Sequence, residues 1–456
     1  CTRMAQNGCD ITCYNRAGHH VSGAEYDKTI EYDGIRQKVV PTIEKKGLAA
    51  VSSSFFAALC SAFGRYDVVH IHAEGPAFFC WIPKLFGKRV ISTIHGLDWA
   101  REKWRGSVAS KFIRGGEKNA VKYADEIIVL SKGVQKYFMD TYGRETHFIP
   151  NGVNRPEVRE AKLITDNFGL KKDSYILFLG RLVPEKGIRY LVEAFKNVKT
   201  DKKLVIAGGS SDTDSFMEEL KELAKGDDRI LFTGFVQGAM LDELYSNAYI
   251  YTLPSDLEGM PLSLLEAMSY GNCCLVSDIP ECAEVVEDKA LIFKKSDVDE
   301  LREKLQDACD YPEKVKEMKA QAADFICKKY NWDAVINETM KLYPKLEMYK
   351  DAIQYGKKHH LPVYLISYGW VPEGMKAIRP NGVEEFISLV SNAHTVFTAS
   401  YHGMLFSLYF NRNFYYYNRG WKERMKSIAE YLQLTDREHW SDEKDSAVID
   451  YTLVNE

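Results

Sequence analysis

Residues 251–271 read Y-T-L-P-S-D-L-E-G-M-P-L-S-L-L-E-A-M-S-Y-G, and this stretch decides the fold that we expect. It predicts a buried strand, a polar loop that contains a glycine, and a helix with one apolar side. Pro261 suits the first helical position because its missing N–H would be unpaired there, and Gly271 suits a left-handed helix end. A strand, loop and helix in this order are typical of an open α/β sheet, which binds ligands at the carboxyl ends of its strands.

Two carboxylates have defined places in this stretch. Glu258 lies in the loop just before the helix, and Glu266 lies inside the helix. Because the free N–H groups of a helix N-terminus attract phosphate, a phosphate bound near residues 260–263 would have one carboxylate on either side. Each carboxylate would then accept hydrogen bonds from sugar hydroxyls. The alternative is an ordinary helix with two solvated glutamates.

A pair of cations follows another expected strand. Residues 178–187 read F-L-G-R-L-V-P-E-K-G, so Arg181 and Lys186 follow the strand that ends at Gly180. Two cations there would neutralise a diphosphate, and they would stabilise the negative charge that grows on it when a sugar–phosphate bond breaks. The alternative is a pair of basic side chains at the surface.

Histidines end two strands of the first half. His95 ends a strand within V-I-S-T-I-H-G-L-D-W, residues 90–99, where it could hydrogen-bond a sugar hydroxyl or the reacting phosphate. The alternative is a histidine with a structural role only. His70 and His72 alternate along another strand and face the same side. A metal site needs further ligands at fixed spacing, so we expect no metal here.

The alternation of elements predicts three domains. Short β-rich runs alternate with helical stretches up to residue 150, and the pattern restarts near residue 175. We therefore expect an α/β protein with two doubly wound, Rossmann-like domains that face a cleft, at residues 1–152 and 153–345. Residues 346–456 form a smaller C-terminal α/β segment. The expected helices are 48–63, 76–85, 107–123, 132–142, 383–391 and several charged helices from 298 to 343.

The composition narrows the class of protein. The chain has 456 residues, 45% of them apolar and 27% charged, with a net charge of −4, as is typical of a soluble globular protein. Basic residues exceed acidic ones up to residue 155. In residues 99–123 they lie beside aromatic residues, which indicates contact with an anionic membrane or a solvated basic face. No signal peptide and no nucleic-acid binding are expected, so the expected location is the cytoplasm; the family resemblance described below implies the inner face of the membrane.

The ten cysteines show no paired metal spacing. Cys60, Cys80 and Cys327 lie in apolar surroundings. We therefore expect buried free thiols in a reducing compartment.

Together these motifs resemble those of a known family. Residues 1–345 resemble the retaining glycosyltransferases of family 4, which have the GT-B fold. The resemblance rests on E-G-M-P-L-S-L-L-E-A-M, on G-R-L-V-P-E-K-G, on I-P-N-G-V-N at the hinge and on T-I-H-G. It implies a glycosyltransferase that moves a hexose or deoxyhexose from a nucleotide-diphosphate sugar to a saccharide or lipid-linked acceptor, with retention, in surface polysaccharide biosynthesis. It implies no metal and no cofactor, and the first domain also resembles bacterial rhamnosyltransferases.

The resemblance also implies roles for single residues. Glu266 would bind the nucleotide ribose, and Arg181 with Lys186 would hold the diphosphate. His95 and Glu258 would act on the donor sugar as the catalytic residues. The backbone at Gly259, Met260 and Pro261 would hold the same sugar.

The start of the chain departs from the family pattern. The first strand of the family and its glycine-rich loop would precede Cys1, so we expect a truncated first domain. An alternative to an active enzyme is therefore a non-catalytic, saccharide-binding protein.

The last hundred residues resemble a second family. Residues 379–410, with the element S-Y-H-G at 400–403, are similar to the C-terminal half of polysaccharide pyruvyl transferases. This resemblance implies Arg379 as an anion contact and His402 as a proton donor. The alternative is a folded remnant or a packing module without its own activity.

Overall fold

The computed structural model describes residues 1–6, 9–16, 31–45, 47–100, 107–209, 214–366, 374–417, 423–445 and 449. The chain divides into two compact units. One unit comprises Cys1–Val69, Leu85–Lys88 and Ile336–Glu456, and the other comprises His70–Lys84 and Arg89–Val335.

A six-stranded parallel sheet is the centre of the second unit. Its strand order is β10-β9-β8-β11-β12-β13. The strands are β8 (Tyr175–Leu179), β9 (Lys203–Ala207), β10 (Ile230–Gly234), β11 (Ile250–Leu253), β12 (Cys273–Ser277) and β13 (Leu291–Phe293). Ile176, Leu177 and Phe178 are fully buried in the central strand β8. Such continuous apolar runs are typical of parallel strands that are covered on both faces.

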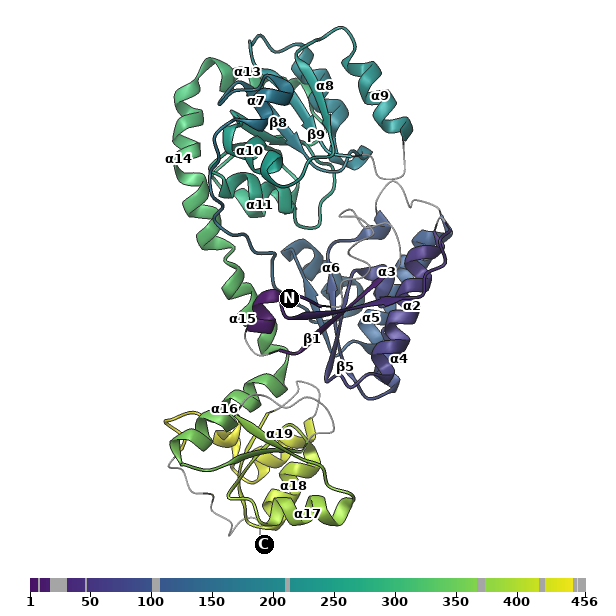
Figure 1. The fold of residues 1–456 in the computed structure, drawn as a ribbon, viewed down its shortest axis with the longest axis vertical. Helices are drawn as coiled ribbons and strands as arrows, with labels where there is room; N and C mark the ends of the chain where they lie inside the picture. The colour runs from purple at the N-terminus through teal and green to yellow at the C-terminus, as the bar shows by residue number, and fades with distance from the viewer. Residues whose placement is uncertain are drawn as a thin grey trace. The chain divides into compact units, whose positions relative to one another are not determined.

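Helices cover both faces of this sheet (Figure 1). They are α7 (Leu163–Phe168), α8 (Ile188–Lys196), α9 (Asp214–Ala224), α10 (Ala239–Asn247), α11 (Leu262–Ser269), α12 (Pro280–Val286), α13 (Val298–Asp310) and α14 (Pro312–Lys329), with the 3-10 turn η4 (Pro184–Lys186) before α8. Helix α15 (Trp332–Lys341) follows α14 and lies away from this sheet (Figure 1). Helix α8 packs against α9 and α13, whereas α11 packs against α14 and α7 against α10. The series α13 to α15 confirms the expected charged helices from residue 298 to 343.

A four-stranded sheet lies earlier in the chain, in the order β4-β5-β6-β7. Its strands are β4 (Val68–His72), β5 (Arg89–Ile94), β6 (Glu126–Val129) and β7 (His147–Phe148), and its helices are α3 (Glu74–Ala77), α4 (Trp81–Leu85), α5 (Val108–Tyr123) and α6 (Lys132–Tyr142), with the 3-10 turn η2 (Asp98–Ala100). The prediction of one helix over 76–85 is wrong, because two short helices occupy this region. Pro83 has no N–H with which to continue a helical ladder.

The first unit contains three further sheets. They are formed by β1 (Ile11–Arg16), β3 (Ile35–Val40) and β2 (Glu31–Tyr32), by β14 (Val363–Ile366) and β15 (Met375–Ile378), and by β16 (Thr395–Thr398) and β17 (Asn413–Tyr416). The helices are α1 (Thr2–Gln6), α2 (Leu48–Phe63), α16 (Pro344–Lys358), α17 (Val383–Ser391), α18 (Tyr401–Tyr409) and α19 (Glu423–Tyr431), with the 3-10 turn η5 (Thr435–Arg437). Strand β2 runs antiparallel to β3, so this small sheet departs from the all-parallel pattern that we expected.

Several details differ from the sequence-based expectations. Pro261 does not begin α11 but precedes it as the N-cap, with an extended backbone, while Gly271 adopts the predicted left-handed conformation with φ of +83°.

All ten cysteines are free thiols. The expectation that they are buried is confirmed for Cys80 and is wrong for Cys60, which is exposed, while Cys327 is half-buried. Helix α2 carries Cys60 on its solvent side. Within the described residues, no helix is long and apolar enough to cross a membrane.

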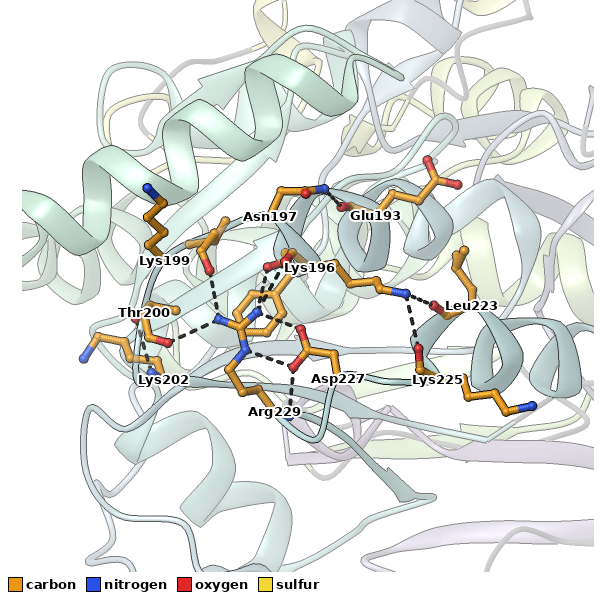
Figure 2. Close-up of polar contacts among 12 residues, drawn as sticks. Glu193, Lys196, Asn197, Lys199, Thr200, Lys202, Leu223, Lys225, Asp227 and Arg229 are labelled. Atoms are coloured by element: carbon orange, nitrogen blue, oxygen red, sulfur yellow. Dashed lines mark hydrogen bonds and ion pairs between the residues drawn. The ribbon is translucent and has the colours of Figure 1, made fainter.

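One arginine links the start of β10 to the end of α8 and to the loop that follows α8 (Figure 2). The guanidinium of Arg229, at the start of β10, donates to the carbonyl oxygens of Val198 at 2.8 Å and Thr200 at 3.2 Å. It also pairs with Asp227 through two nitrogens, at 2.7 and 2.9 Å, and lies over the ring of Phe195, 4.8 Å from its centre. Arg229 also donates to the carbonyl oxygens of Phe195 and Lys196, both at 3.5 Å, so it reaches acceptors at the C-terminal end of α8 that the helix leaves unpaired.

We expect Arg229→Ala to lower the free energy of unfolding by about 2 kcal/mol, because several charge-assisted hydrogen bonds disappear together. Arg229→Lys should recover only part of this loss, since an ammonium group lacks the planar fork of donors. Urea denaturation measures both. The matched control is Arg302→Ala, which removes only loose surface pairs at 3.7 and 3.9 Å and should change little. Equal effects of Arg229→Ala and Arg302→Ala would contradict this account.

Candidate functional site

The loop between β11 and α11 is held by hydrogen bonds to neighbouring segments of the fold. The backbone N–H of Asp256 donates to the carbonyl of Glu185 at 2.9 Å. The carboxylate of Asp256 accepts from Tyr190 at 3.0 Å and from Ser296 at 2.7 Å. Gly187 has φ of +66°, and a side chain there would lie 1.9 Å from the carbonyl oxygen of Pro254. The two loops that carry the predicted cations and carboxylates are therefore packed against each other.

Lys186 and Glu258 form a direct ion pair across these loops. Lys186 Nζ lies 2.7 Å from Glu258 Oε1, and the side chains are only 14% and 8% exposed. Ser255 donates to the same oxygen at 2.6 Å. Within the described residues no donor reaches Glu258 Oε2, so this oxygen remains available to a hydroxyl group of a ligand. The sequence placed both residues at one site, but it did not predict that they pair.

Arg181 supplies a second cation in the same loop. It follows β8 and Gly180, its side chain is exposed, and it forms no ion pair within the described part of the chain. An exposed guanidinium with no carboxylate partner is suited to bind an anion through two parallel hydrogen bonds.

The start of α11 offers further donors. Its N-cap is Pro261, which gives no side-chain cap, and the first backbone bonds run from Leu264 and Leu265 to the carbonyl of Pro261. The N–H groups of Leu262 and Ser263 have no recorded acceptor among the described residues. Uncapped N–H groups at a helix start attract anions.

Glu266 lies one turn further along α11. Its Oε2 accepts from the hydroxyl of Tyr245 at 3.1 Å, and Tyr245 stacks on Tyr270 with ring centres 5.2 Å apart. Desolvation raises the pKa of Glu266, and the hydrogen bond from Tyr245 opposes that rise. The side chain as a whole remains exposed, so Glu266 can accept hydrogen bonds from a ligand. No signal in the sequence identified Tyr245 as its partner.

His95 reaches the loop between β11 and α11 through its backbone. A side chain on Gly259 would lie 1.6 Å from the carbonyl oxygen of His95, and one on Gly96 would lie 2.9 Å from the Cα atom of Gly259. The N–H of Asn151 also contacts the sulfur of Met260 at 3.0 Å. The turn after β5 and the hinge therefore touch the loop that carries Glu258, and this contact requires glycine at two positions.

The imidazole of His95 belongs to a chain of histidines. His95 Nε2 lies 3.1 Å from His72 Nδ1, and His72 stacks on His70 with ring centres 4.4 Å apart. His70 in turn bonds Thr93 at 2.7 Å. Desolvation lowers the pKa of His95, and that of His70 more strongly, so both rings are neutral at physiological pH. His70 and His72 face one side, as predicted.

No metal cluster accompanies these histidines. Over the described residues, no group of three or more His, Cys, Asp or Glu side chains is placed to hold a metal ion.

Within the described residues, no contact joins Arg379 and His402, the two residues of the site predicted in the C-terminal segment. Arg379 follows β15 and is exposed, and His402 lies exposed in the first turn of α18, after β16. Strands β15 and β16 belong to different sheets. Close packing explains the glycine at position 403, since a side chain there would lie 2.3 Å from the Thr398 hydroxyl.

Two family models match the chain. Residues 1–155 match the model described as glycosyltransferase family 4, and residues 161–325 match the model described as glycosyl transferases group 1. These matches confirm the resemblance to family 4. The resemblance of residues 379–410 to pyruvyl transferases stays a prediction.

Curated relatives point to the same class. The chain is 26% identical over 305 residues to an uncharacterised glycosyltransferase of Methanocaldococcus jannaschii, covering 61% of this chain and 75% of that protein. It is 29% identical over 258 residues to an Escherichia coli α-1,3-galactosyltransferase named for UDP-Gal and GlcNAc-diphosphoundecaprenol, covering 52% and 64%.

Solved structures confirm the predicted α/β GT-B fold. Sucrose-phosphate synthase of Thermosynechococcus elongatus matches with a TM-score of 0.64 and 21% identity, over 75% of this chain and 90% of that one. HepE of Anabaena in complex with UDP-glucose matches with a TM-score of 0.58 and 16% identity, over 68% and 86%.

We expect Gly259→Ala to disrupt the contact between the loop after β11 and the turn after β5, because the new methyl group would overlap the His95 carbonyl. Binding of a ligand at this loop should weaken at least about tenfold, or about 1.4 kcal/mol. Isothermal titration calorimetry with a nucleotide-diphosphate sugar, the class of ligand that the sequence predicts, measures the change. The control is Gly382→Ala, where the added methyl group meets open space and φ is −172°. Unchanged affinity in Gly259→Ala would show that the contact is dispensable.

Proposed function

Since the chain is a glycosyltransferase with a family 4 domain followed by a group 1 domain, we propose that it moves a hexose or deoxyhexose from a nucleoside-diphosphate sugar to a saccharide or lipid-linked acceptor. We place this reaction in surface polysaccharide biosynthesis. The observation that supports it best is the buried Lys186–Glu258 pair in the same loops as Arg181, which has no ion-pair partner among the described residues, and the uncapped start of α11.

These groups match the parts of such a donor. Arg181, Lys186 and the first N–H groups of α11 are suited to bind the diphosphate, since all three carry positive or partly positive charge. Glu266 is placed to accept from the ribose hydroxyls. Glu258 Oε2 and the backbone at Gly259, Met260 and Pro261 are suited to hold the donor sugar, with His95 opposite.

The proposed reaction retains the configuration of the sugar. The bond between the anomeric carbon and the diphosphate oxygen breaks, and the acceptor oxygen forms its bond on the same face. The acceptor hydroxyl gives its proton to the departing diphosphate. Arg181 and Lys186 stabilise the negative charge that develops on that group, which lowers the barrier more than it stabilises the bound substrate.

The relatives support the classes of donor and acceptor. HepE has been solved with UDP-glucose, and the Escherichia coli galactosyltransferase is named for a UDP-sugar and a lipid diphosphate acceptor. Another Escherichia coli relative is an O-antigen chain mannosyltransferase. A rhamnosyl donor remains the narrower form of the proposal. It rests on the resemblance of the first domain to bacterial rhamnosyltransferases.

Helix α5 supports contact with an anionic membrane surface, as a lipid-linked acceptor would require. Lys111, Arg114, Lys118 and Lys122 are all exposed and recur at helical spacing, so they form one basic stripe. Trp104 and Arg105, which contributed to the same expectation, lie outside the described residues. We therefore propose that the enzyme works at the cytoplasmic face of the membrane.

Lys186→Ala and Glu266→Ala should each lower donor affinity at least about tenfold while the protein stays folded. Calorimetry with UDP-glucose, UDP-galactose and dTDP-rhamnose measures this, and melting curves monitor folding because Lys186→Ala leaves Glu258 without its cation. Lys225→Ala, which removes a surface pair with Glu222, is the control. Failure of the wild-type chain to bind any donor would refute the proposed function, and unchanged affinity in both variants would refute the site.

Lys111→Glu combined with Lys118→Glu should abolish co-sedimentation with vesicles that contain anionic lipid, because the stripe on α5 loses its positive charge. Vesicles of neutral phosphatidylcholine should not bind either protein. Lys136→Glu with Lys225→Glu makes the same change in net charge away from α5. If that variant also stops binding, the effect is one of net charge and the α5 surface is not specific.

A further inference from the structure

Two glutamates that are not among the residues assigned to the donor lie fully buried in the four-stranded part of the protein. Glu74 begins α3 directly after β4, and Glu117 lies in the middle of α5; both are completely inaccessible to solvent. Gly116 allows this close packing, because a side chain there would lie 1.8 Å from the carbonyl oxygen of Glu74. Buried carboxylates need partners, and neither of these glutamates pairs with a lysine or arginine within the described residues.

The hydrogen bonds of Glu117 and Glu74 are unequal. Glu117 accepts from the indole of Trp99 at 2.9 Å, from Tyr137 at 3.0 Å and from Tyr142. Glu74 accepts through Oε2 from the backbone N–H of Asp98 at 2.8 Å, whereas its buried Oε1 finds no donor among the described residues. A proton on Glu74 removes this deficit, since a neutral carboxyl group can donate to Glu117.

The electrostatic surroundings agree with this assignment. Burial, followed by the hydrogen bond and the charge of Glu117, raises the pKa of Glu74 to about 10. Asp98 adds a further negative charge nearby. Among the described residues, the other titratable groups facing the pair are Tyr137 and Tyr142, both neutral at physiological pH, and Arg114 lies over the Trp99 ring, 4.0 Å from its centre.

We propose that Glu74 is a positioning residue that, as a neutral carboxyl group shared with Glu117, holds the turn from His95 to Asp98 in place for glycosyl transfer. The inference rests on the proposed function for its catalytic consequence. Glu74 holds one end of this turn at the Asp98 N–H, and the other end contacts the donor-side loop at Gly259 through the His95 carbonyl and Gly96. Ionisation of Glu74 would put a second negative charge beside Glu117 and would displace the turn.

The assignment has a defined consequence for stability against pH. Unfolded, Glu74 ionises near its ordinary pKa, whereas folded it keeps its proton up to about pH 10. Between these two pKa values the folded state carries a proton on Glu74 that the unfolded state has lost. The free energy of unfolding therefore falls as the pH rises through this range. Glu74→Gln keeps the shape and the donor but cannot ionise, so it should melt at a higher temperature than the wild type at about pH 8.5, with the difference shrinking toward about pH 5.

The decisive experiment measures kcat and KM of the full chain from about pH 6 to about pH 10, with the donor that the wild type turns over. We expect Glu74→Gln to keep kcat within about threefold of the wild type. As the pH rises toward about 10, kcat of this variant should fall less than kcat of the wild type. Glu74→Ala should lower kcat at least about tenfold with a smaller change in the KM for the donor. The control is Glu145→Gln, an exposed acid of the same domain, which should change neither quantity.

Four outcomes distinguish the possibilities. If Glu74→Gln loses as much kcat as Glu74→Ala, an ionised carboxylate is required and the proposal is wrong. If both variants keep full kcat while the melting curves still show the pH dependence, Glu74 is only structural and the positioning role is wrong. If the wild type turns over no donor, the proposed function fails, and a melting temperature of Glu74→Gln that follows the wild type at every pH would overturn the shared proton as well.

Discussion

The buried ion pair between Lys186 and Glu258 is the interaction on which the candidate site depends. Strands β8 and β11 are neighbours in the sheet, so the loops at their carboxyl ends meet. The ion pair, the Asp256 hydrogen bonds and the close approach of Gly187 to Pro254 hold these two loops together. Separating two charges that are so little exposed costs free energy, because each would remain desolvated without its partner. The contacts of the fold itself therefore hold these two loops in place.

A second constraint acts from the opposite side of the site. The turn after β5 touches Gly259 with backbone atoms, and backbone contacts allow little adjustment. The same turn is bonded to β4 and α3 through His72 and Glu74, both from the segment H-I-H-A-E. The residues that follow β4 therefore influence the candidate site without belonging to the surface that would contact the proposed donor. This arrangement gives a role to His72 and Glu74, which lie near the candidate site although they belong to none of its motifs.

Much of the fold and part of the site could be predicted from the sequence. Helices 48–63 and 132–142 have the expected ends, because their apolar spacing and flanking residues are unambiguous. Glu258, Glu266, Arg181 and Lys186 fall in the expected loops and helix. The pairing of Lys186 with Glu258, the Tyr245 partner of Glu266 and the Glu74–Glu117 contact could not be predicted. Each joins residues that are distant in sequence, and local pattern carries no information on which side chains meet.

The uncapped start of α11 has a consequence for the catalytic cycle. On the proposed function, its open N–H groups and the nearby cations recognise the diphosphate, a group that the donor shares with the nucleotide left after transfer. The enzyme therefore has little means of telling spent nucleotide from fresh donor at this end of the molecule. Accumulated nucleoside diphosphate would occupy the site and slow the next round. Sustained synthesis would then depend on a separate activity that removes the by-product.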